Sequence, residues 1–373
     1  MVPVLNIGII LSFFLSLLLF SKKNKSLTDN LLSLLLLVIG IHLTSNFLFY
    51  QGYWGQYPHL IGITVPFPFL YGPLLYLYVL YSIKSSNRLQ KIDFLHFTPF
   101  LLSYIYMIPF YFFYTAEEKT QVDKGLVDDF GIFSNIILVG FIVSGISYSV
   151  VAYRRLLQHQ KLIQENFSYS NRISLSWLRY AILGIGAVFI TAAIVSILRE
   201  VLDFQFPFNA DILFYSLIVA FVVYVGYSGI RQQNLFSNTI ANEQELSKSE
   251  SEYKKSGLKS DVAVSKHREL MDLMEKEKLY LDPKLNLNML SERLSVSSNH
   301  LSQIINQYEK VNFHDFVNSY RVEEFIQRAQ RNKNFTLLAH ALDSGFNSKS
   351  SFNSIFKKLK SQSPSQFMAG LNN

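Results

Sequence analysis

Two stretches near the C-terminal end of the chain carry hydrogen-bonding side chains on one side of a helical pattern. In each stretch, apolar residues recur at a helical period and predict one buried stripe: Leu301, Ile304, Ile305 and Tyr308, then Phe352, Ile355, Phe356 and Leu359 about 51 positions later. The opposite faces and helix starts hold the candidate site residues Asn299, His300, Gln303, Asn306, Lys349, Ser350, Ser354, Lys357 and Lys358. Asparagine, glutamine, serine and lysine side chains can hydrogen-bond base edges in the major groove of DNA. The pattern therefore predicts two helices that read DNA.

A shorter helix and a tight connection precede each of these helices. The first motif has a helix over 287–294, a turn over 295–297 and a helix over 298–308. The second has a helix over 336–342, a turn over 345–347 and a helix over 348–359. In both, a small polar residue, Ser298 or Ser348, opens the second helix, where it can cap free backbone N–H groups. Both patterns are typical of helix-turn-helix motifs.

A longer helix is expected between the two motifs, over about Asn312 to Arg331. At 1.5 Å per residue it would span roughly 30 Å, close to the roughly 34 Å of one turn of B-DNA. Such a rod can place two recognition helices in successive major grooves. From Lys284 onward, eleven basic residues face six acidic ones, which is a moderate field for phosphate binding. The charge alone would equally fit an ordinary solvated surface.

The C-terminal part of the chain resembles a known family. The segments Asn299-His-Leu-Ser-Gln-Ile-Ile-Asn306, Gly345-Phe-Asn-Ser-Lys-Ser-Ser-Phe-Asn-Ser-Ile-Phe-Lys357 and Ser363-Pro-Ser-Gln-Phe367 resemble the AraC/XylS transcription regulators over about residues 270–370. The resemblance implies two helix-turn-helix motifs on a connecting helix, binding promoter DNA, and the whole chain is similar to membrane-embedded members with a seven-helix N-terminal half. It departs from the pattern at Ser295, where glycine is frequent, at His340, where an apolar residue is expected, and at the turn over 360–363.

The N-terminal part has a different composition, dominated by Leu, Ile, Val, Phe and Tyr. A spanning helix needs roughly 20 mainly apolar residues, and seven stretches meet that requirement: Val2–Phe20, Leu31–Tyr50, Leu60–Ile83, Phe94–Tyr114, Gly131–Tyr153, Trp177–Leu198 and Ile212–Ile230. The first could be a signal peptide, but it lacks a preceding basic residue and a following cleavage site, so a retained helix is favoured.

Lysine and arginine in the short loops predict the orientation. Loops after the odd-numbered stretches hold eleven of these residues, whereas the alternate loops hold only Lys119 and Lys124, with Arg199 at a helix end. The N-terminus is therefore expected outside, and an odd number of crossings places the C-terminal part in the cytoplasm. The expected location is the cytoplasmic (inner) membrane, with multiple passes.

Two histidines inside the apolar stretches, His42 and His96, are candidates for sensing pH or a ligand, with an interhelical hydrogen bond as the alternative. The last stretch contains no lysine for a retinal Schiff base, so a light-driven retinal protein is excluded. Cysteine is absent, which excludes disulfides and thiolate metal sites.

The sequence thus predicts an all-α protein: a seven-helix transmembrane bundle over 1–231, a cytoplasmic linker over 232–265 and a double helix-turn-helix DNA-binding domain over 266–373. We expect a membrane-anchored transcription regulator that couples a membrane or extracytoplasmic signal to promoter binding, with no catalytic residues, cofactor or metal. Its expected partners are double-stranded promoter DNA and the lipid bilayer, while a homodimer and an unidentified signal ligand stay open. The alternative is a transporter- or receptor-like membrane protein whose tail binds other proteins. An enzyme tail is disfavoured because no Gly-rich nucleotide loop or metal-ligand cluster follows Arg231.

Overall fold

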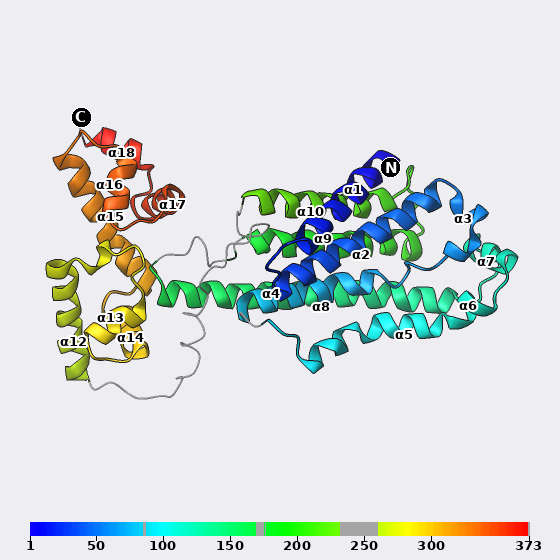
Figure 1. Ribbon diagram of the computed structural model, residues 1–373, viewed down its shortest axis with the longest axis horizontal. Helices are drawn as coiled ribbons and strands as arrows, with labels where there is room; N and C mark the ends of the chain where they lie inside the picture. The colour runs from blue at the N-terminus through cyan, green and yellow to red at the C-terminus, as the bar shows by residue number, and fades with distance from the viewer. Residues whose placement is uncertain (85–86, 169–174, 176, 232–259, 372–373) are drawn as a thin grey trace. The chain divides into compact units, whose positions relative to one another are not determined.

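The computed structural model describes residues 1–84, 87–168, 175, 177–231 and 260–371 (Figure 1). These residues form helices and connections and contain no β-strand, which confirms the all-α fold class. They divide into two compact units. Unit 1 holds residues 1–156 and 177–231, and unit 2 holds residues 157–168, 175 and 260–371. The expected linker falls mostly on 232–259, outside the described residues.

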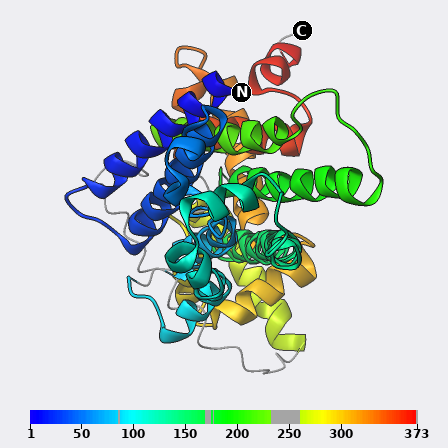
Figure 2. The same cartoon turned by 90° about the vertical axis from the view of Figure 1, so that its right-hand side faces the viewer.

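Unit 1 is a bundle of apolar helices. Its elements are α1 Val2–Phe20, α2 Leu27–Tyr50, α3 Tyr53–Gln56, η1 Pro58–Leu60, α4 Pro68–Lys84, η2 Lys91–Phe97, α5 Thr98–Tyr106, α6 Ile108–Phe113, α7 Ala116–Asp123, α8 Gly131–Asn166, α9 Trp177–Ser196, η3 Ile197–Val201 and α10 Asp211–Arg231. Helices α1 and α2 lie side by side (Figure 1 and Figure 2). Ser16 of α1 and Ser33 of α2 donate hydroxyl protons to each other's carbonyl oxygens, both at 2.9 Å. Such small polar residues allow apolar helices to pack closely.

Six helical stretches among the described residues are long and apolar enough to cross a membrane. They are Val2–Phe20, Leu27–Tyr50, Lys91–Phe113, Gly131–Asn166, Trp177–Arg199 and Asp211–Ser228. Their outward side chains include large apolar residues with high exposed fractions, such as Phe112 at 77% and Ile132 at 81%. Exposed apolar surface of this extent is unusual for a protein surrounded by water, and it suits contact with lipid.

The remaining expected span, 60–83, is shorter than the sequence indicated. Helix α4 begins only at Pro68 and has 17 residues, while residues 61–67 form turns. Proline has no N–H group and disfavours helical backbone in the residue before it, so Pro66 and Pro68 delay the start of the helix. At 1.5 Å per residue, α4 is roughly 25 Å long. It packs within the bundle against α2 and α9.

Helix α8 is longer than the sequence predicted. Its expected apolar span ended at Tyr153, but the helix continues to Asn166 and has 36 residues, a length of roughly 54 Å. The polar continuation is helical because nothing between 154 and 166 interrupts it: the segment contains no proline and no glycine. Residues up to 156 belong to unit 1, whereas residues from 157 onward belong to unit 2. The two units therefore share one helix.

Unit 2 contains the two expected motifs. Its elements are α12 Ser260–Asp272, η5 Leu273–Glu277, η6 Leu279–Leu281, α13 Leu287–Arg293, α14 Ser298–Tyr308, α15 Phe313–Arg331, α16 Leu337–Asp343, α17 Lys349–Lys360 and α18 Pro364–Gly370. Helix α12 begins at Ser260, within the expected linker and ahead of residue 266, where the DNA-binding domain was expected to begin.

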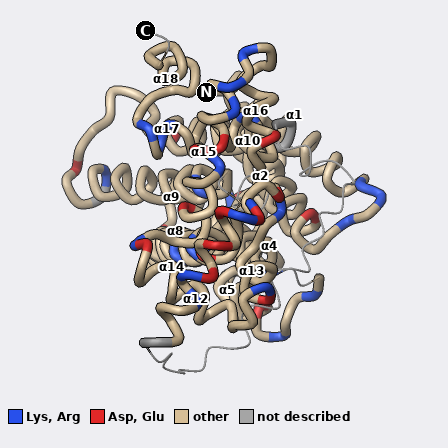
Figure 3. The backbone as a smooth tube through the Cα atoms, turned by 90° about the vertical axis from the view of Figure 1, so that its left-hand side faces the viewer, with Lys and Arg blue, Asp and Glu red and all other residues tan. Residues whose placement is uncertain are grey.

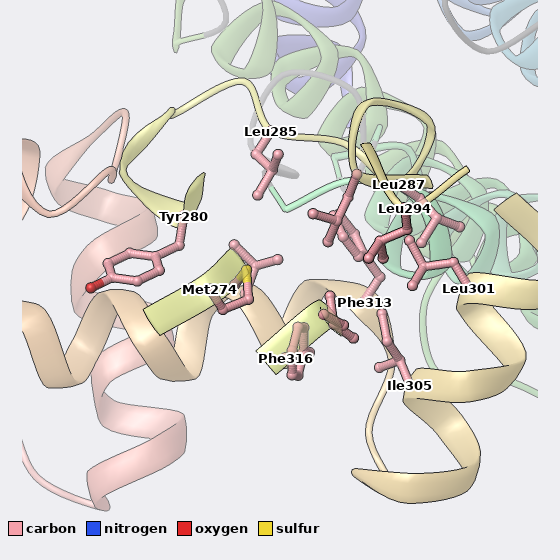
Figure 4. Close-up of a cluster of buried hydrophobic side chains, with 12 residues drawn as sticks. Met274, Tyr280, Leu285, Leu287, Leu294, Leu301, Ile305, Phe313 and Phe316 are labelled. Carbon is pink, nitrogen blue, oxygen red and sulfur yellow. The ribbon is translucent and has the colours of Figure 1, made fainter. Parts of the chain in front are cut away.

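Two apolar cores lie along α15. The first contains Phe313, Phe316 and Val317 of α15 with residues of α12, α13 and α14, and Figure 4 shows it. The second contains Val322, Phe325, Ile326 and Ala329 of α15 with residues of α16, α17 and α18. One half of α15 thus supports each motif, and the relative placement of the motifs depends on this helix.

Candidate nucleic-acid interface

The first motif consists of α13, a turn and α14. Asn286 caps α13 by accepting a hydrogen bond from the N–H of Met289 at 2.9 Å, and Ser297 caps α14 by accepting one from the N–H of His300 at 3.2 Å. The capping serine therefore stands one position before the expected Ser298. In the turn, Ser295 adopts a left-handed backbone with φ of 52°. That conformation favours glycine, so serine at this position carries a local backbone cost.

The second motif repeats this construction with α16 and α17. Thr336 caps α16 and Ser348 caps α17 through their side-chain oxygens. The turn contains Gly345, with φ of 92°, and a Cβ atom there would lie 2.3 Å from the carbonyl oxygen of Tyr280. Glycine is required at this position both by the backbone conformation and by the close approach of another segment.

The apolar stripes are confirmed at three of their four positions in each motif. Leu301, Ile304 and Ile305 are buried, as are Phe352, Ile355 and Phe356. The fourth positions differ: Tyr308 is half-buried with its ring stacked on His267, and Leu359 is 38% exposed. Burial of the stripes orients the opposite faces of α14 and α17 outward.

The candidate site residues accordingly lie on the surface. In α14, Asn299, Gln303 and Asn306 are exposed and His300 is half-buried. In α17, the exposed residues are Lys349, Ser350, Ser354, Lys357 and Lys358. Figure 3 marks the lysines and arginines of this unit in blue, including those of α17. Two helices of similar construction therefore present polar, hydrogen-bonding faces.

Residues 290–370 match a protein family described as a helix-turn-helix domain, of the AraC type. The segment is similar to AraC-type helix-turn-helix domains, and we call it the AraC-type domain. Searches among curated proteins and among solved structures returned no match. The family match supports a DNA-binding transcription regulator, because the family is a DNA-binding regulator domain and not an enzyme.

The candidate residue Lys358 forms an ion pair within the protein. The ammonium of Lys358 lies 2.7 and 2.8 Å from the two carboxylate oxygens of Asp315 in the first turn of α15. A hydrogen bond from His314, together with the charge and hydrogen bonds of Lys358, lowers the pKa of Asp315 to about 2. A phosphate group would have to compete with this carboxylate for Lys358. A DNA contact by Lys358 stays a prediction.

His340, which departs from the apolar pattern of the family, is buried in the second motif. Its Nε2 atom lies 2.8 Å from the carbonyl oxygen of Asn332, and the hydroxyl of Ser344 donates to the carbonyl oxygen of His340 at 2.7 Å. The ring also contacts Phe335 edge to face. The histidine thus tolerates burial because its polar atom is paired.

The role of Arg321 was not predicted from the sequence, where this residue is one of the eleven basic residues from Lys284 onward. The side chain is 1% exposed and lies on α15 between the two cores. Burial lowers the pKa of its guanidinium to about 10, so the group stays positively charged at neutral pH. The spacing contains a signal: Val317, Arg321 and Phe325 recur every four residues, which places the arginine on the apolar face of the helix.

The two histidines considered for sensing, His42 and His96, each form a hydrogen bond with a tyrosine hydroxyl from another element. The Nδ1 atom of His42 in α2 lies 2.6 Å from the hydroxyl of Tyr71 in α4, and the Nδ1 atom of His96 in η2 lies 2.7 Å from the hydroxyl of Tyr148 in α8. This geometry agrees with the interhelical hydrogen bond that was the alternative to a sensing role. Within the described residues, no group of three or more His, Asp or Glu side chains is arranged to hold a metal ion.

Proposed function

We propose that this protein is a membrane-anchored, sequence-specific transcription regulator that senses a membrane or extracytoplasmic signal without a separate partner kinase. The observation that carries the proposal is the presence of two features in one chain. An AraC-type domain presents the polar faces of α14 and α17, and the same chain has six helical stretches long and apolar enough to cross a membrane.

The distribution of basic loop residues supports a cytoplasmic location for the AraC-type domain. With α4 as a seventh crossing, the N-terminus lies outside and Arg231 lies at the cytoplasmic face. The orientation requires α4 to cross, because six crossings would return the chain to the side on which it began. The exit of the last span on the cytoplasmic side gives the domain access to the chromosome.

Contacts with DNA, to base edges and to phosphates, are proposed for the polar faces of the two recognition helices. In α14 the contacts come from Asn299, His300, Gln303 and Asn306, and in α17 from Lys349, Ser350, Ser354, Lys357 and Lys358. The 19 residues of α15 span roughly 28 Å, which suits successive major grooves on one side of the duplex. A homodimer would double the number of half-sites, and His42 and His96 are the proposed positions for response to a signal.

The decisive experiment maps the promoter regions that the intact protein occupies in cells and then measures binding of those fragments to the full chain in lipid nanodiscs. We expect specific binding over competitor DNA that weakens as salt rises, because phosphate contacts release counterions. Lys349→Ala should lower specific affinity more than non-specific affinity. Loss of all specific binding at low and moderate salt would remove the regulator function and favour a membrane protein with a protein-binding tail.

A further inference from the structure

The segment of residues 157–168, which consists of the end of α8 and the two residues after it, packs within unit 2. Two of its apolar residues, Ile163 and Phe167, are buried. Phe167 pairs with Asn286, just before α13, in an isolated antiparallel bridge, and the N–H of Ser168 donates to the carbonyl oxygen of Leu285 at 3.3 Å. We call residues 157–168 the docking segment. It contacts the AraC-type domain with both backbone and side chains.

Ser168 also contacts the buried arginine of α15. The guanidinium of Arg321 has five N–H donors, and five hydrogen bonds occupy them. Nε donates to the carbonyl oxygen of Tyr280 at 2.7 Å, and one terminal nitrogen donates to the backbone carbonyl oxygen of Asp282 at 2.7 Å. The other terminal nitrogen donates to the side-chain oxygen of Asn318 and to the backbone carbonyl oxygen of Ser168, both at 3.2 Å. The fifth bond runs from the first terminal nitrogen to the hydroxyl oxygen of Ser168 at 3.1 Å.

The docking segment therefore supplies two of the five acceptors of a buried cation. None of the five acceptors is a carboxylate, and the hydrogen bonds to neutral oxygens add to the favourable charge of nearby Asp282. A buried charged group that loses hydrogen-bond partners is strongly disfavoured. Without the docking segment, Arg321 would have to move or admit water. Its position would then no longer be determined by the surrounding chain.

Arg321 lies where the two helix-turn-helix motifs meet. Tyr280 belongs to the core of the first motif, and Gly345 lies in the turn of the second. A Cβ atom at Gly345 would approach both the carbonyl oxygen of Tyr280 at 2.3 Å and the Nε atom of Arg321 at 2.9 Å. The arginine thus contacts one motif directly and abuts the other. A change in its position changes how the motifs are placed relative to each other.

We propose that the docking segment, through Ser168 and Arg321, holds the two helix-turn-helix motifs in the relative pose that binds two DNA half-sites together, so that movement of α8 controls promoter binding. The inference rests on the proposed DNA-binding function. The docked state is the competent one because a fixed distance between α14 and α17 lowers the entropy cost of binding both half-sites. Arg321 is a positioning residue, since it acts through the recognition helices.

The test uses the full chain in lipid nanodiscs. The protein contains no cysteine, so within one chain the double variant Phe167→Cys and Asn286→Cys can form only the bond across the bridge. Paired residues in an antiparallel bridge have Cα atoms about 4.5 to 5.5 Å apart, within the range that a disulfide spans. We expect the disulfide to form on oxidation. Each single variant serves as a control, and Phe167→Cys with Asn353→Cys, at an exposed position of α17, should not cross-link.

Binding is then measured for a promoter fragment with both half-sites and for the same fragment with one half-site scrambled. Reduction breaks the introduced disulfide and leaves a cysteine in place of the buried Phe167 ring. The reduced double variant should therefore bind the two-site fragment at least about fivefold more weakly than the oxidised form, the lower end of ordinary coupling between sites. The one-site fragment should bind both forms equally.

Ser168→Ala supplies a second variant that keeps the buried Phe167 ring. It removes the hydroxyl bonds to Leu285 and Arg321 but retains the backbone contacts. The ratio of two-site to one-site affinity should fall. Lys161→Ala, at a position whose side chain is 78% exposed on the same segment, is the matched control and should leave the ratio unchanged.

The outcomes separate the coupling from the function on which it rests. Failure of the disulfide to form would overturn docking whatever the DNA results. A disulfide with equal two-site affinity in both redox states, or a loss of thermal stability with an unchanged affinity ratio, would show that the contact is only structural. Disulfide formation without any specific DNA binding would remove the proposed function, and the coupling with it, while leaving the docked segment in place.

Discussion

Lys358 near the end of α17 and Asp315 in the first turn of α15 form an ion pair through both carboxylate oxygens, at 2.7 and 2.8 Å. The two residues are 43 positions apart. Asp315 lies on the part of α15 that contributes Phe313 and Phe316 to the first core, and Lys358 lies on α17, which contributes Ile355 and Phe356 to the second. The pair therefore ties the second recognition helix to the start of the connecting helix. It adds a charged contact to the packing that places α17.

Acidification should weaken this tie. The pKa of Asp315 lies at about 2 in the folded protein, below the value of about 3.9 in an unfolded chain. Because the folded pKa is the lower one, the stabilisation is fully present above about pH 4 and is lost as pH falls towards 2. Hydrogen exchange of amides in α15, compared between wild type and Asp315→Asn at each pH, should show faster exchange in the variant at neutral pH. The difference should vanish near pH 2, and a difference independent of pH would contradict the assignment.

Gly345→Ala should destabilise the AraC-type domain by about 2 to 4 kcal/mol, because a left-handed backbone costs alanine about 1 to 2 kcal/mol and the close approach to Tyr280 adds to it. Hydrogen exchange or limited proteolysis of the full chain measures the loss. Gly370→Ala is the matched control, since a Cβ atom there meets nothing within 4 Å. Equal stability of the two variants would contradict the close approach at Gly345.

Gln303→Ala should cost about 1 to 3 kcal/mol of specific binding and relax the base preference at one operator position. Gln303 is exposed on the face of α14 opposite the buried stripe. Gln327→Ala, an exposed glutamine of α15, is the control and should change little. Lys357→Ala should instead weaken binding to all sequences and reduce the slope of affinity against salt by about 1. A uniform loss for Gln303→Ala would place that residue on the phosphate backbone rather than on a base.

Single cysteines introduced into this cysteine-free chain should report whether α4 crosses the membrane. Gln56→Cys precedes α4 and Lys91→Cys follows it, and both positions are exposed. With an impermeant maleimide on intact cells, we expect Gln56→Cys to react and Lys91→Cys to react only after permeabilisation. Labelling of both without permeabilisation would mean that α4 does not cross. An even number of crossings would then separate the AraC-type domain from the chromosome.

Hydrophobic periodicity and capping residues, read from the sequence alone, determined the all-α fold class and the surface faces of α14 and α17. These features are local: Leu301, Ile304 and Ile305 form a stripe whatever lies elsewhere in the chain, and serine caps the helix that follows it. The apolar spans of the bundle were predicted for the same reason, because each is a run of consecutive apolar residues. This locality also explains why the helix start at Pro68 was missed, since hydropathy does not register the missing N–H groups of proline.

Only the tertiary structure decided what the charged residues do. Arg321 and Lys358 belonged to the same basic field in the sequence, yet one is buried and the other is paired with Asp315. The partners of Arg321 are Tyr280, 41 positions away, and Ser168, 153 positions away. No period or motif connects residues at such separations. Their contact follows from the placement of Ser168, two residues beyond the end of α8, beside Arg321 of α15. A buried guanidinium must take its hydrogen-bond acceptors from the segments that the fold brings to it.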